Sequence, residues 1–309
     1  MGTYHTPVLR DKSLDYLVTS PSGTYIDATF GGGGHTIALL SRLSGDGRVI
    51  AFDRDADSLG NAPEDPRLYM VHGNFRYIRN FALLAGRRED GFPEDGKVDG
   101  ILADLGVSSH QFDTASRGFS FRWDAPLDMR MNTEGGMTAA DVVGTYGKED
   151  LERILRLYGE VDSPGRVASL IVKAREEHRI ETTGELSSVL EPVLPKAAPH
   201  KVLAKIFQAL RIEVNQEMKA LEKFLRNCTP TLAPGGTLVV ITYHSLEDRM
   251  VKNFMKTGSV SGEEAKDFYG RSLSPFEVLT RKPVLPSEEE ISSNTRARSA
   301  KLRAARRIQ

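Results

Sequence analysis

A run of four glycines between two apolar segments constrains this chain more than any other feature. Gly31–Gly34 follow the strand-like residues Thr24–Ala28 and precede a helical pattern that begins near His35. Glycine loses more conformational entropy on folding than any other residue, so four in a row are unfavourable unless the backbone must pass very close to another group. A strand, a glycine loop and a helix in that order present backbone N–H groups at the carboxyl edge of a sheet. We therefore expect a ligand at this loop.

The first hundred residues alternate between strand-like and helix-like patterns, which predicts an α/β fold with a parallel sheet. The strand-like runs are Thr24–Ala28, Val49–Asp53, Leu68–His72 and Val98–Asp104. The α/β pattern resumes at Thr237–Tyr243, after a glycine-containing turn. Near the end of the chain, Glu277–Val284 and Ser299–Ile308 predict an antiparallel pair.

Between about residues 110 and 200 the pattern changes to amphipathic segments without a convincing strand. Apolar residues recur at helical spacing in the stretches Leu151–Tyr158, Val167–Ala174 and Leu186–Val193. We predict an inserted all-helical domain at 110–200, within an α/β domain formed by 1–109 and 201–309. The spacing also predicts one long helix over 201–227.

Composition excludes several classes of protein. The chain has 309 residues, 39% of them hydrophobic and 27% charged, which is an ordinary globular balance. A net charge of −1 gives no global signal for nucleic acid, so any such signal must be local. A single cysteine excludes a disulfide framework and a thiolate zinc cluster and fits a reducing cytoplasm. We assign no metal ligand, and the sequence does not specify whether a metal assists. We expect no signal peptide and no membrane association, because no long apolar run occurs.

Acidic residues at the ends of successive strands indicate which ligand the glycine loop binds. Asp53 ends the second strand, where an acid commonly holds ribose hydroxyls in dinucleotide-binding folds as well. Three details favour S-adenosylmethionine. Thr36 stands where a dinucleotide loop would have its third glycine, and Asp27 would repel a pyrophosphate but suits the cationic amino-acid end of S-adenosylmethionine. Asp104 ends the fourth strand, where methyltransferases keep a polar residue beside the transferable methyl group.

The longer motifs closely resemble one family over nearly the whole chain. In chain order they are HTPVL (His5–Leu9), DATFGGGGH (Asp27–His35), DRD (Asp53–Asp55), HGNF (His72–Phe75), DLGVSS (Asp104–Ser109), RGFSF (Arg117–Phe121), PLDMRM (Pro126–Met131), FQALRIEVN (Phe207–Asn215), LAPGG (Leu232–Gly236), YHSLEDR (Tyr243–Arg249) and RARSAKLR (Arg296–Arg303). The chain is identified as a member of the small-subunit ribosomal RNA N4-cytosine methyltransferase family, known as RsmH or MraW. The glycine loop alone would not be specific enough for this assignment.

The resemblance implies a fold, a reaction and a set of site residues. The fold is a class I (Rossmann-like) methyltransferase sheet with the inserted domain helping to recognise substrate. The reaction is S-adenosylmethionine-dependent N4-methylation of a decoding-centre cytidine in 16S rRNA, within the small ribosomal subunit. The implied cofactor contacts are Gly33, Gly34, His35, Asp53, Phe75, Asp104 and Gln111.

The residue types agree with attack by an exocyclic amine. Methylation of cytosine carbon 5 requires a cysteine nucleophile, and the lone Cys228 is expected to be a packing residue near a helix end. Amine attack instead requires hydrogen-bond acceptors that orient the amine and receive its developing charge. Asp104 is the candidate acceptor. No stacking aromatic follows Asp104, so we expect His244 with the turn after Thr237–Tyr243, or the aromatic loop Arg117–Trp123, to hold the base.

Local basic segments are candidates for RNA contact. Residues 291–309 contain six Lys or Arg and no acid. Arg117, Arg122 and Arg130 add positive charge near the expected cofactor edge. A solvated tail or surface ion pairs would be the ordinary explanation for such a charge run.

Two other functions compete with methyl transfer. A nicotinamide-dependent oxidoreductase is disfavoured by Thr36 and Asp27. A non-catalytic RNA-binding protein of ribosome assembly is disfavoured by the acids at the strand ends. The sequence does not specify the oligomeric state.

Overall fold

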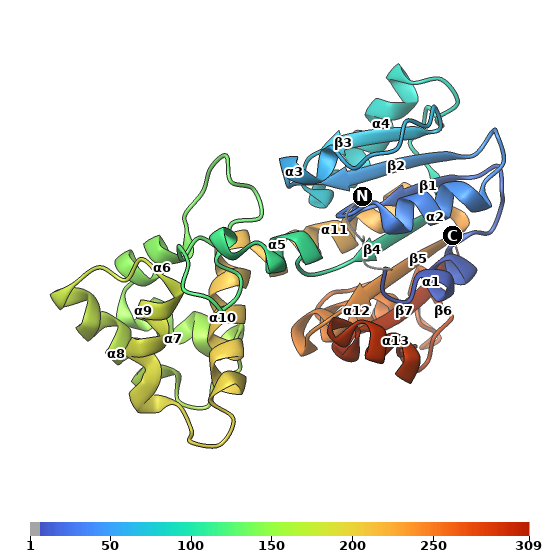
Figure 1. The fold of residues 1–309 in the computed structure, drawn as a ribbon. Helices are drawn as coiled ribbons and strands as arrows, with labels where there is room; N and C mark the ends of the chain where they lie inside the picture. The colour runs from blue at the N-terminus through green and yellow to red at the C-terminus, as the bar shows by residue number, and fades with distance from the viewer. Residues whose placement is uncertain (1–6, 309) are drawn as a thin grey trace. The chain divides into compact units, whose positions relative to one another are not determined.

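The computed structural model describes residues 7–308, and its contacts divide the chain into two compact units (Figure 1). Unit 1 is Met1–Gly106 with Met218–Gln309, and unit 2 is Val107–Glu217. His5 and Thr6 of the first motif lie outside the described residues. No helix within residues 7–308 has the length and apolar character needed to cross a bilayer.

Unit 1 contains a seven-stranded sheet of order β3-β2-β1-β4-β5-β7-β6. Its strands are β1 Thr24–Asp27, β2 Arg48–Asp53, β3 Leu68–His72, β4 Val98–Asp104, β5 Leu232–Thr242, β6 Phe276–Val278 and β7 Lys301–Arg307. The first five strands are parallel to one another, and β7 runs antiparallel to β5 and β6. The predicted α/β sheet and the antiparallel pair near the C-terminus are confirmed. The strand order reverses between β1 and β4, which is where open α/β sheets bind ligands.

Helices cover both faces of this sheet (Figure 1). In unit 1 they are α1 Arg10–Leu17, α2 Gly34–Arg42, α3 Ala56–Leu59, α4 Ile78–Arg88, α11 Glu217–Thr231, α12 Ser245–Thr257 and α13 Glu288–Ser293, with 3-10 turns η1 Phe75–Tyr77 and η4 Thr295–Ser299. Alternate residues of β5 point to opposite faces. Leu238 and Val240 pack with α4, α11 and α12, whereas Val239 and Ile241 pack with α1 and α2.

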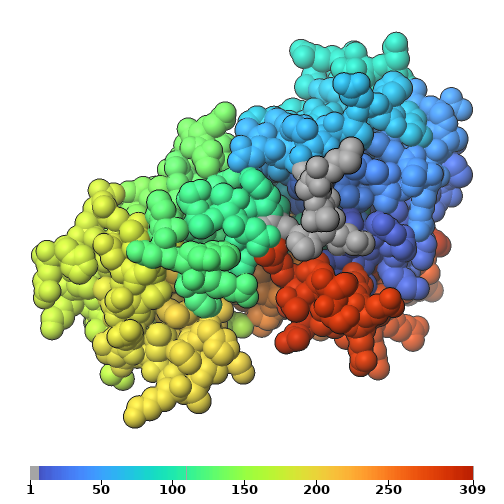
Figure 2. All heavy atoms as spheres, viewed as in Figure 1, coloured from blue at the N-terminus to red at the C-terminus, as the bar shows by residue number. Residues whose placement is uncertain are grey.

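A segment near the N-terminus contacts a segment of the C-terminal part of unit 1. The Leu9 backbone N–H donates to Oε1 of Glu290 at 2.5 Å. In Figure 2 the C-terminal segment, in red, accordingly lies beside the dark-blue residues near the N-terminus.

Unit 2 is helical, and the structure assigns no strand to residues 107–217. Its helices are α5 Ser109–Asp113, α6 Ala139–Thr145, α7 Lys148–Leu157, α8 Pro164–Glu177, α9 Thr183–Leu190 and α10 Pro199–Asn215, with 3-10 turns η2 Ala115–Arg117 and η3 Glu191–Val193. Buried residues such as Ile154, Ile171 and Leu186 form its core.

The single helix predicted over 201–227 is wrong. The helix α10 ends at Asn215, Gln216 adopts a left-handed conformation with φ of 51°, and α11 begins at Glu217. The buried Asn215 amide donates to the Met129 carbonyl at 2.7 Å and accepts from the Met131 N–H at 2.8 Å, which fixes the break. Because α10 buries its apolar face in the core of unit 2, this unit extends to Glu217 and does not end at residue 200.

Candidate cofactor and catalytic site

The glycine loop is shaped first by the protein itself. Gly31 and Gly33 have φ of 54° and 79°, a region that favours glycine. A Cβ built on Gly33 would lie 2.7 Å from Cζ of Phe30, and one built on Gly34 would overlap the ring of Pro7. A larger side chain at Gly33 therefore meets Phe30 within the loop, in addition to any ligand outside it.

Asp53 at the end of β2 holds the loop in place. Its Oδ2 accepts the Gly31 N–H at 2.7 Å and its Oδ1 accepts the Asp55 N–H at 2.8 Å. Burial raises the pKa of Asp53, and these two backbone hydrogen bonds partly offset that effect. An ionised carboxylate offers about four acceptor positions, so Asp53 retains capacity for the hydroxyl groups of a ligand.

Asp27 and Thr36 form a buried pair beneath the loop. The Thr36 hydroxyl donates to Oδ2 of Asp27 at 2.7 Å, and the Thr29 N–H donates to Oδ1 at 3.1 Å. Asp27 is fully buried, and burial is the main reason why its pKa is raised. The residue that breaks the dinucleotide glycine pattern thus supplies the hydrogen bond that the buried carboxylate requires.

Three side chains from three elements meet at the point where the strand order reverses. Asp104 ends β4, His35 lies in the first turn of α2, and Tyr243 directly follows β5. Nε2 of His35 is 3.5 Å from Oδ2 of Asp104, an ion-pair distance that is long for a hydrogen bond. The Tyr243 hydroxyl donates to Oδ1 of Asp104 at 2.8 Å. The strand-end and loop patterns predicted His35 and Asp104 as site residues. Tyr243 was not predicted, although its place at the carboxyl end of the neighbouring strand was a usable signal.

The protonation of this cluster follows from its surroundings. Burial lowers the pKa of His35, but the carboxylates of Asp104 and Asp27 outweigh it, so the pKa is raised overall. Burial, followed by the charge of Asp104, raises the pKa of Tyr243 well above its usual value. The cluster therefore contains a neutral phenol that donates to a carboxylate, and an imidazole that is protonated more readily than a free histidine side chain.

The cluster fits a polar cofactor. Nδ1 of His35 is buried and finds no hydrogen-bond partner among residues 7–308. A buried polar atom without a partner is costly, so its position beside the glycine loop favours a ligand group there. The donor set of loop N–H groups, an imidazole and strand-end carboxylates suits the charged amino-acid end and the ribose of S-adenosylmethionine.

Phe75 follows β3 and is held by packing. Its ring meets Phe224 edge to face with centroids 5.1 Å apart, and it is only partly buried against the core of unit 1. One part of the ring thus remains available to cover an adenine. That contact stays a prediction.

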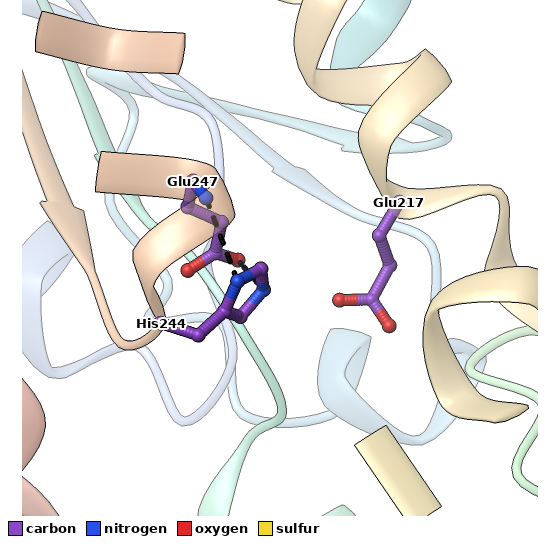
Figure 3. A group of neighbouring side chains, drawn as sticks. All are labelled: Glu217, His244 and Glu247. Carbon is purple, nitrogen blue, oxygen red and sulfur yellow. Dashed lines mark hydrogen bonds and ion pairs between the residues drawn. The ribbon is translucent and has the colours of Figure 1, made fainter. Parts of the chain in front are cut away.

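His244 is engaged within its own turn. It is the N-cap of α12, with Nδ1 accepting the Glu247 N–H at 3.5 Å and Nε2 lying 3.2 Å from Oε1 of Glu247 (Figure 3). Glu217, also labelled in Figure 3, forms a two-pronged ion pair with Arg211. The predicted role of His244 in holding the base stays a prediction.

Gln111 belongs to unit 2. It lies in α5, where its side chain and that of Ser108 form a reciprocal cap of the helix. It is buried. Its contact with the cofactor remains a prediction.

The aromatic loop of unit 2 divides its side chains between the core and solvent. Phe119 and Phe121 pack into the core of unit 2, and Phe121 meets Phe207 edge to face. Trp123 is 46% exposed. Of the basic residues predicted nearby, Arg117 is buried and donates to the carbonyls of residues 130 and 131, while Arg130 pairs with Asp128. Arg122 is exposed.

Most of the basic C-terminal segment is built into the sheet. Arg303 is buried and pairs with Asp248 at 2.7 Å, and Lys301 approaches the same carboxylate at 3.7 Å. Arg306 pairs with Glu277, and Arg307 donates to the carbonyl of residue 232. Arg298 in η4 is exposed, so it is better placed than these residues for a phosphate.

Cys228 is a core residue, as expected. It lies in α11, fully buried in the core of unit 1. Burial raises the pKa of its thiol well above the usual value, which disfavours the thiolate. A cysteine-dependent reaction at carbon 5 has no nucleophile here.

Comparisons with known proteins agree over the whole chain. The sequence model of the MraW methylase family matches residues 2–308. A Bacteroides fragilis protein named ribosomal RNA small subunit methyltransferase H is 54% identical over 303 residues, which cover 98% of this chain and 97% of that protein. Proteins of the same name from Parabacteroides distasonis and Flavobacterium johnsoniae are 52% and 48% identical, and each alignment covers 99% of this chain and 98% of the relative.

Proposed function

The chain belongs to the MraW methylase family and is an S-adenosylmethionine-dependent methyltransferase of small-subunit ribosomal RNA, and on this premise we propose that it methylates N4 of a decoding-centre cytidine in 16S rRNA. Family membership excludes the two competing functions, a nicotinamide-dependent oxidoreductase and a non-catalytic assembly protein. The proposal concerns the atom, the nucleotide and the residues that act.

The residues at the carboxyl edge of the sheet suit the cofactor in distinct ways. The N–H groups around Gly33 and Gly34, with Nδ1 of His35, face its amino-acid end. Asp53 accepts its ribose hydroxyls, and Phe75 covers its adenine. Bound S-adenosylmethionine supplies an electrophilic methyl group on a sulfonium. Positioning of the nucleophile in line with that group supplies much of the rate.

Asp104 is the residue that receives the target amine. Its carboxylate accepts an N–H of the cytosine amine, which turns the nitrogen toward the methyl group and stabilises the positive charge that develops on it. As the N–C bond forms, the bond between the methyl group and sulfur breaks with its electron pair going to sulfur, and the nitrogen loses one proton, which Asp104 accepts. No covalent enzyme intermediate is required, in agreement with the buried Cys228.

Unit 2 supplies contacts to RNA in this proposal. Trp123 exposes its indole although its backbone is held firmly, since its carbonyl accepts the Thr183 hydroxyl at 2.7 Å and the Gly184 N–H donates to Asp124 at 2.9 Å. An exposed aromatic ring on a fixed loop suits stacking on an unpaired base, and the neighbouring Arg122 suits a phosphate. Action on small ribosomal subunits would place the enzyme in the cytoplasm.

The observation that carries the proposal is the Asp104 carboxylate between His35 and Tyr243 at the edge where the strand order reverses. The test is Asp104→Asn, assayed for methyl transfer to small subunits that lack the modification. We expect S-adenosylhomocysteine to bind and transfer to be lost. Transfer at the wild-type rate would exclude Asp104 as the acceptor.

A further inference from the structure

Tyr243 makes three contacts after the end of β5, and the reaction proposed above assigns it no role. Its hydroxyl donates to Oδ1 of Asp104 at 2.8 Å. Its ring lies against Gly106, where a Cβ would be 3.5 Å from Cδ2 of the ring. Its backbone N–H donates to Oε2 of Glu247 at 2.9 Å. These contacts hold both the backbone and the side chain of Tyr243, and its hydroxyl points at the carboxylate of Asp104.

We propose that Tyr243 is a positioning residue for methyl transfer, because its hydroxyl holds the Asp104 carboxylate in the orientation that accepts the target amine. This inference rests on the proposed role of Asp104. It adds a residue to the reaction and explains how that carboxylate is oriented.

The need for such a residue follows from the torsional freedom of aspartate. The terminal torsion of an Asp side chain is broad, so a carboxylate at a strand end turns easily unless it is held. Tyr243 engages Oδ1 and His35 faces Oδ2, so both oxygens have a fixed neighbour. Each oxygen keeps a further lone pair, and those lone pairs have defined directions. An error of about 1 Å in the placement of a reacting group costs on the order of a hundredfold in rate.

Tyr243 is itself held by the turn that follows β5. Glu247 is 3% exposed, and its Oε2 accepts the Tyr243 backbone N–H. Its Oε1 lies beside the imidazole of His244 (Figure 3). A buried carboxylate with partners at both oxygens fixes this turn more firmly than either contact alone. Glu247 thus holds the backbone of Tyr243, and His244 lies beside the same carboxylate.

The charged groups around this pair determine how it responds to pH. The charged or titratable groups near Asp104 are Asp27 at the end of β1, His35 in α2 and Tyr243 after β5. Tyr243 is influenced by Asp104, Glu247 and Glu290. A hydrogen bond from the phenol stabilises the charged form of the carboxylate that accepts the amine, and Tyr243→Phe removes that stabilisation.

The test is Tyr243→Phe, which removes one oxygen and keeps the ring against Gly106. A hydrogen bond to a charged group of this kind corresponds to about a tenfold to hundredfold effect, so we expect kcat to fall by that factor. The KM for S-adenosylmethionine should change by less than about threefold, because the ground-state contacts of the cofactor remain. The acid limb of the pH profile of kcat should move to higher pH, which a purely structural defect would not cause.

Two further substitutions separate the possible outcomes. Tyr25→Phe is the matched control, since it removes a phenol that donates to the Ser20 carbonyl at 2.7 Å near the amino end of β1, and it should leave the pH profile unchanged. Asp104→Asn tests the premise. If Asp104→Asn is inactive while Tyr243→Phe keeps the wild-type kcat and pH profile, the positioning role of Tyr243 is overturned and the proposed function stands. An active Asp104→Asn would overturn the proposed function as well.

A second measurement applies if Tyr243→Phe is unstable. Site-specific replacement of Tyr243 by 3-fluorotyrosine keeps the hydroxyl and makes it a more acidic, stronger donor. The acid limb of kcat should then move to lower pH, opposite to the effect of the phenylalanine. An unchanged limb would contradict the proposal.

Discussion

Nε2 of His35 lies 3.5 Å from Oδ2 of Asp104, so the first turn of α2 and the end of β4 share one ion pair at the edge where the strand order reverses. The imidazole is nearly fully buried and the carboxylate is partly exposed. This pair links the glycine loop, which precedes His35, to the residue proposed to receive the target amine. Its protonation should therefore affect both stability and cofactor binding.

Replacement of His35 by Gln should remove a pH dependence of stability. The pKa of His35 is raised above its ordinary value of 6.5 by Asp104 and Asp27, which outweigh the effect of burial. The folded protein then holds a proton more tightly than the unfolded chain, so this stabilisation is complete below pH 6.5 and is lost as pH rises through the folded pKa. Urea unfolding of the cofactor-free protein between pH 5.5 and 8.5 measures this effect.

The difference in the free energy of unfolding between the wild-type protein and His35→Gln separates the contribution of His35 from that of other titrating residues. The free energy of unfolding of the wild type should fall relative to that of the variant as pH rises above 6.5. Parallel curves for the two proteins would show that folding does not raise the pKa of His35.

Gly33→Ala should weaken both the fold and cofactor binding. A non-glycine residue in the left-handed region costs about 1–2 kcal/mol, and the new Cβ would also press on Phe30. We expect a lower free energy of unfolding and at least a tenfold loss of affinity for S-adenosylhomocysteine, measured by calorimetry. Gly135→Ala is the control, because a Cβ there meets nothing within 4 Å. Wild-type affinity in Gly33→Ala would contradict the loop's role in cofactor binding.

Trp123→Ala should weaken binding to RNA without loss of stability. Stacking of a base on an aromatic side chain is worth about 1–3 kcal/mol, so affinity for unmodified small subunits should fall by roughly 5- to 150-fold. Phe268→Ala is the control, since Phe268 is 98% exposed in a loop of unit 1. The chain has one tryptophan, so its fluorescence reports on Trp123 alone. Quenching by a decoding-region RNA fragment is expected, and an unchanged spectrum at saturation would rule out stacking.

Two arginines of the basic C-terminal segment should behave differently. Arg303→Ala leaves the partly buried carboxylate of Asp248 with Lys301 as its remaining ion-pair partner, so it should lower the free energy of unfolding by about 2 kcal/mol. Arg298→Ala should leave stability unchanged and lower affinity for small subunits, with the salt dependence reduced by about one ion. Equal losses of stability in the two variants would contradict this division of roles.

The strands of unit 1 and the acidic residues at their ends could be predicted, because the sequence patterns that mark them are local. The runs that became β3 and β4 were found with the observed boundaries, and Asp53 and Asp104 lie at their expected strand ends. The glycines marked the loop correctly. Their contacts with Phe30 and Pro7 required the three-dimensional arrangement, since no spacing rule brings those rings to the loop.

The predictions that failed depended on tertiary structure. Gln216 adopts a left-handed conformation without being glycine, so the end of α10 had no marker in the sequence. The C-terminal segment was correctly predicted to pair as a strand, but its charge did not indicate that β7 lies between β5 and β6 and directs Arg303 at Asp248. Tyr243 was missed because its relation to Asp104 requires the pairing of β4 with β5.

The most direct test of the account is methyl transfer to small ribosomal subunits from cells that lack this enzyme. The protein is incubated with labelled S-adenosylmethionine and these subunits, and in parallel with naked 16S rRNA and with DNA. Nuclease digestion and mass spectrometry then locate any new methyl group. The account predicts one methyl group on N4 of a decoding-centre cytidine in the subunit, and none with Asp104→Asn. A methyl group on carbon 5 or on another nucleotide, or transfer that survives Asp104→Asn, would contradict it.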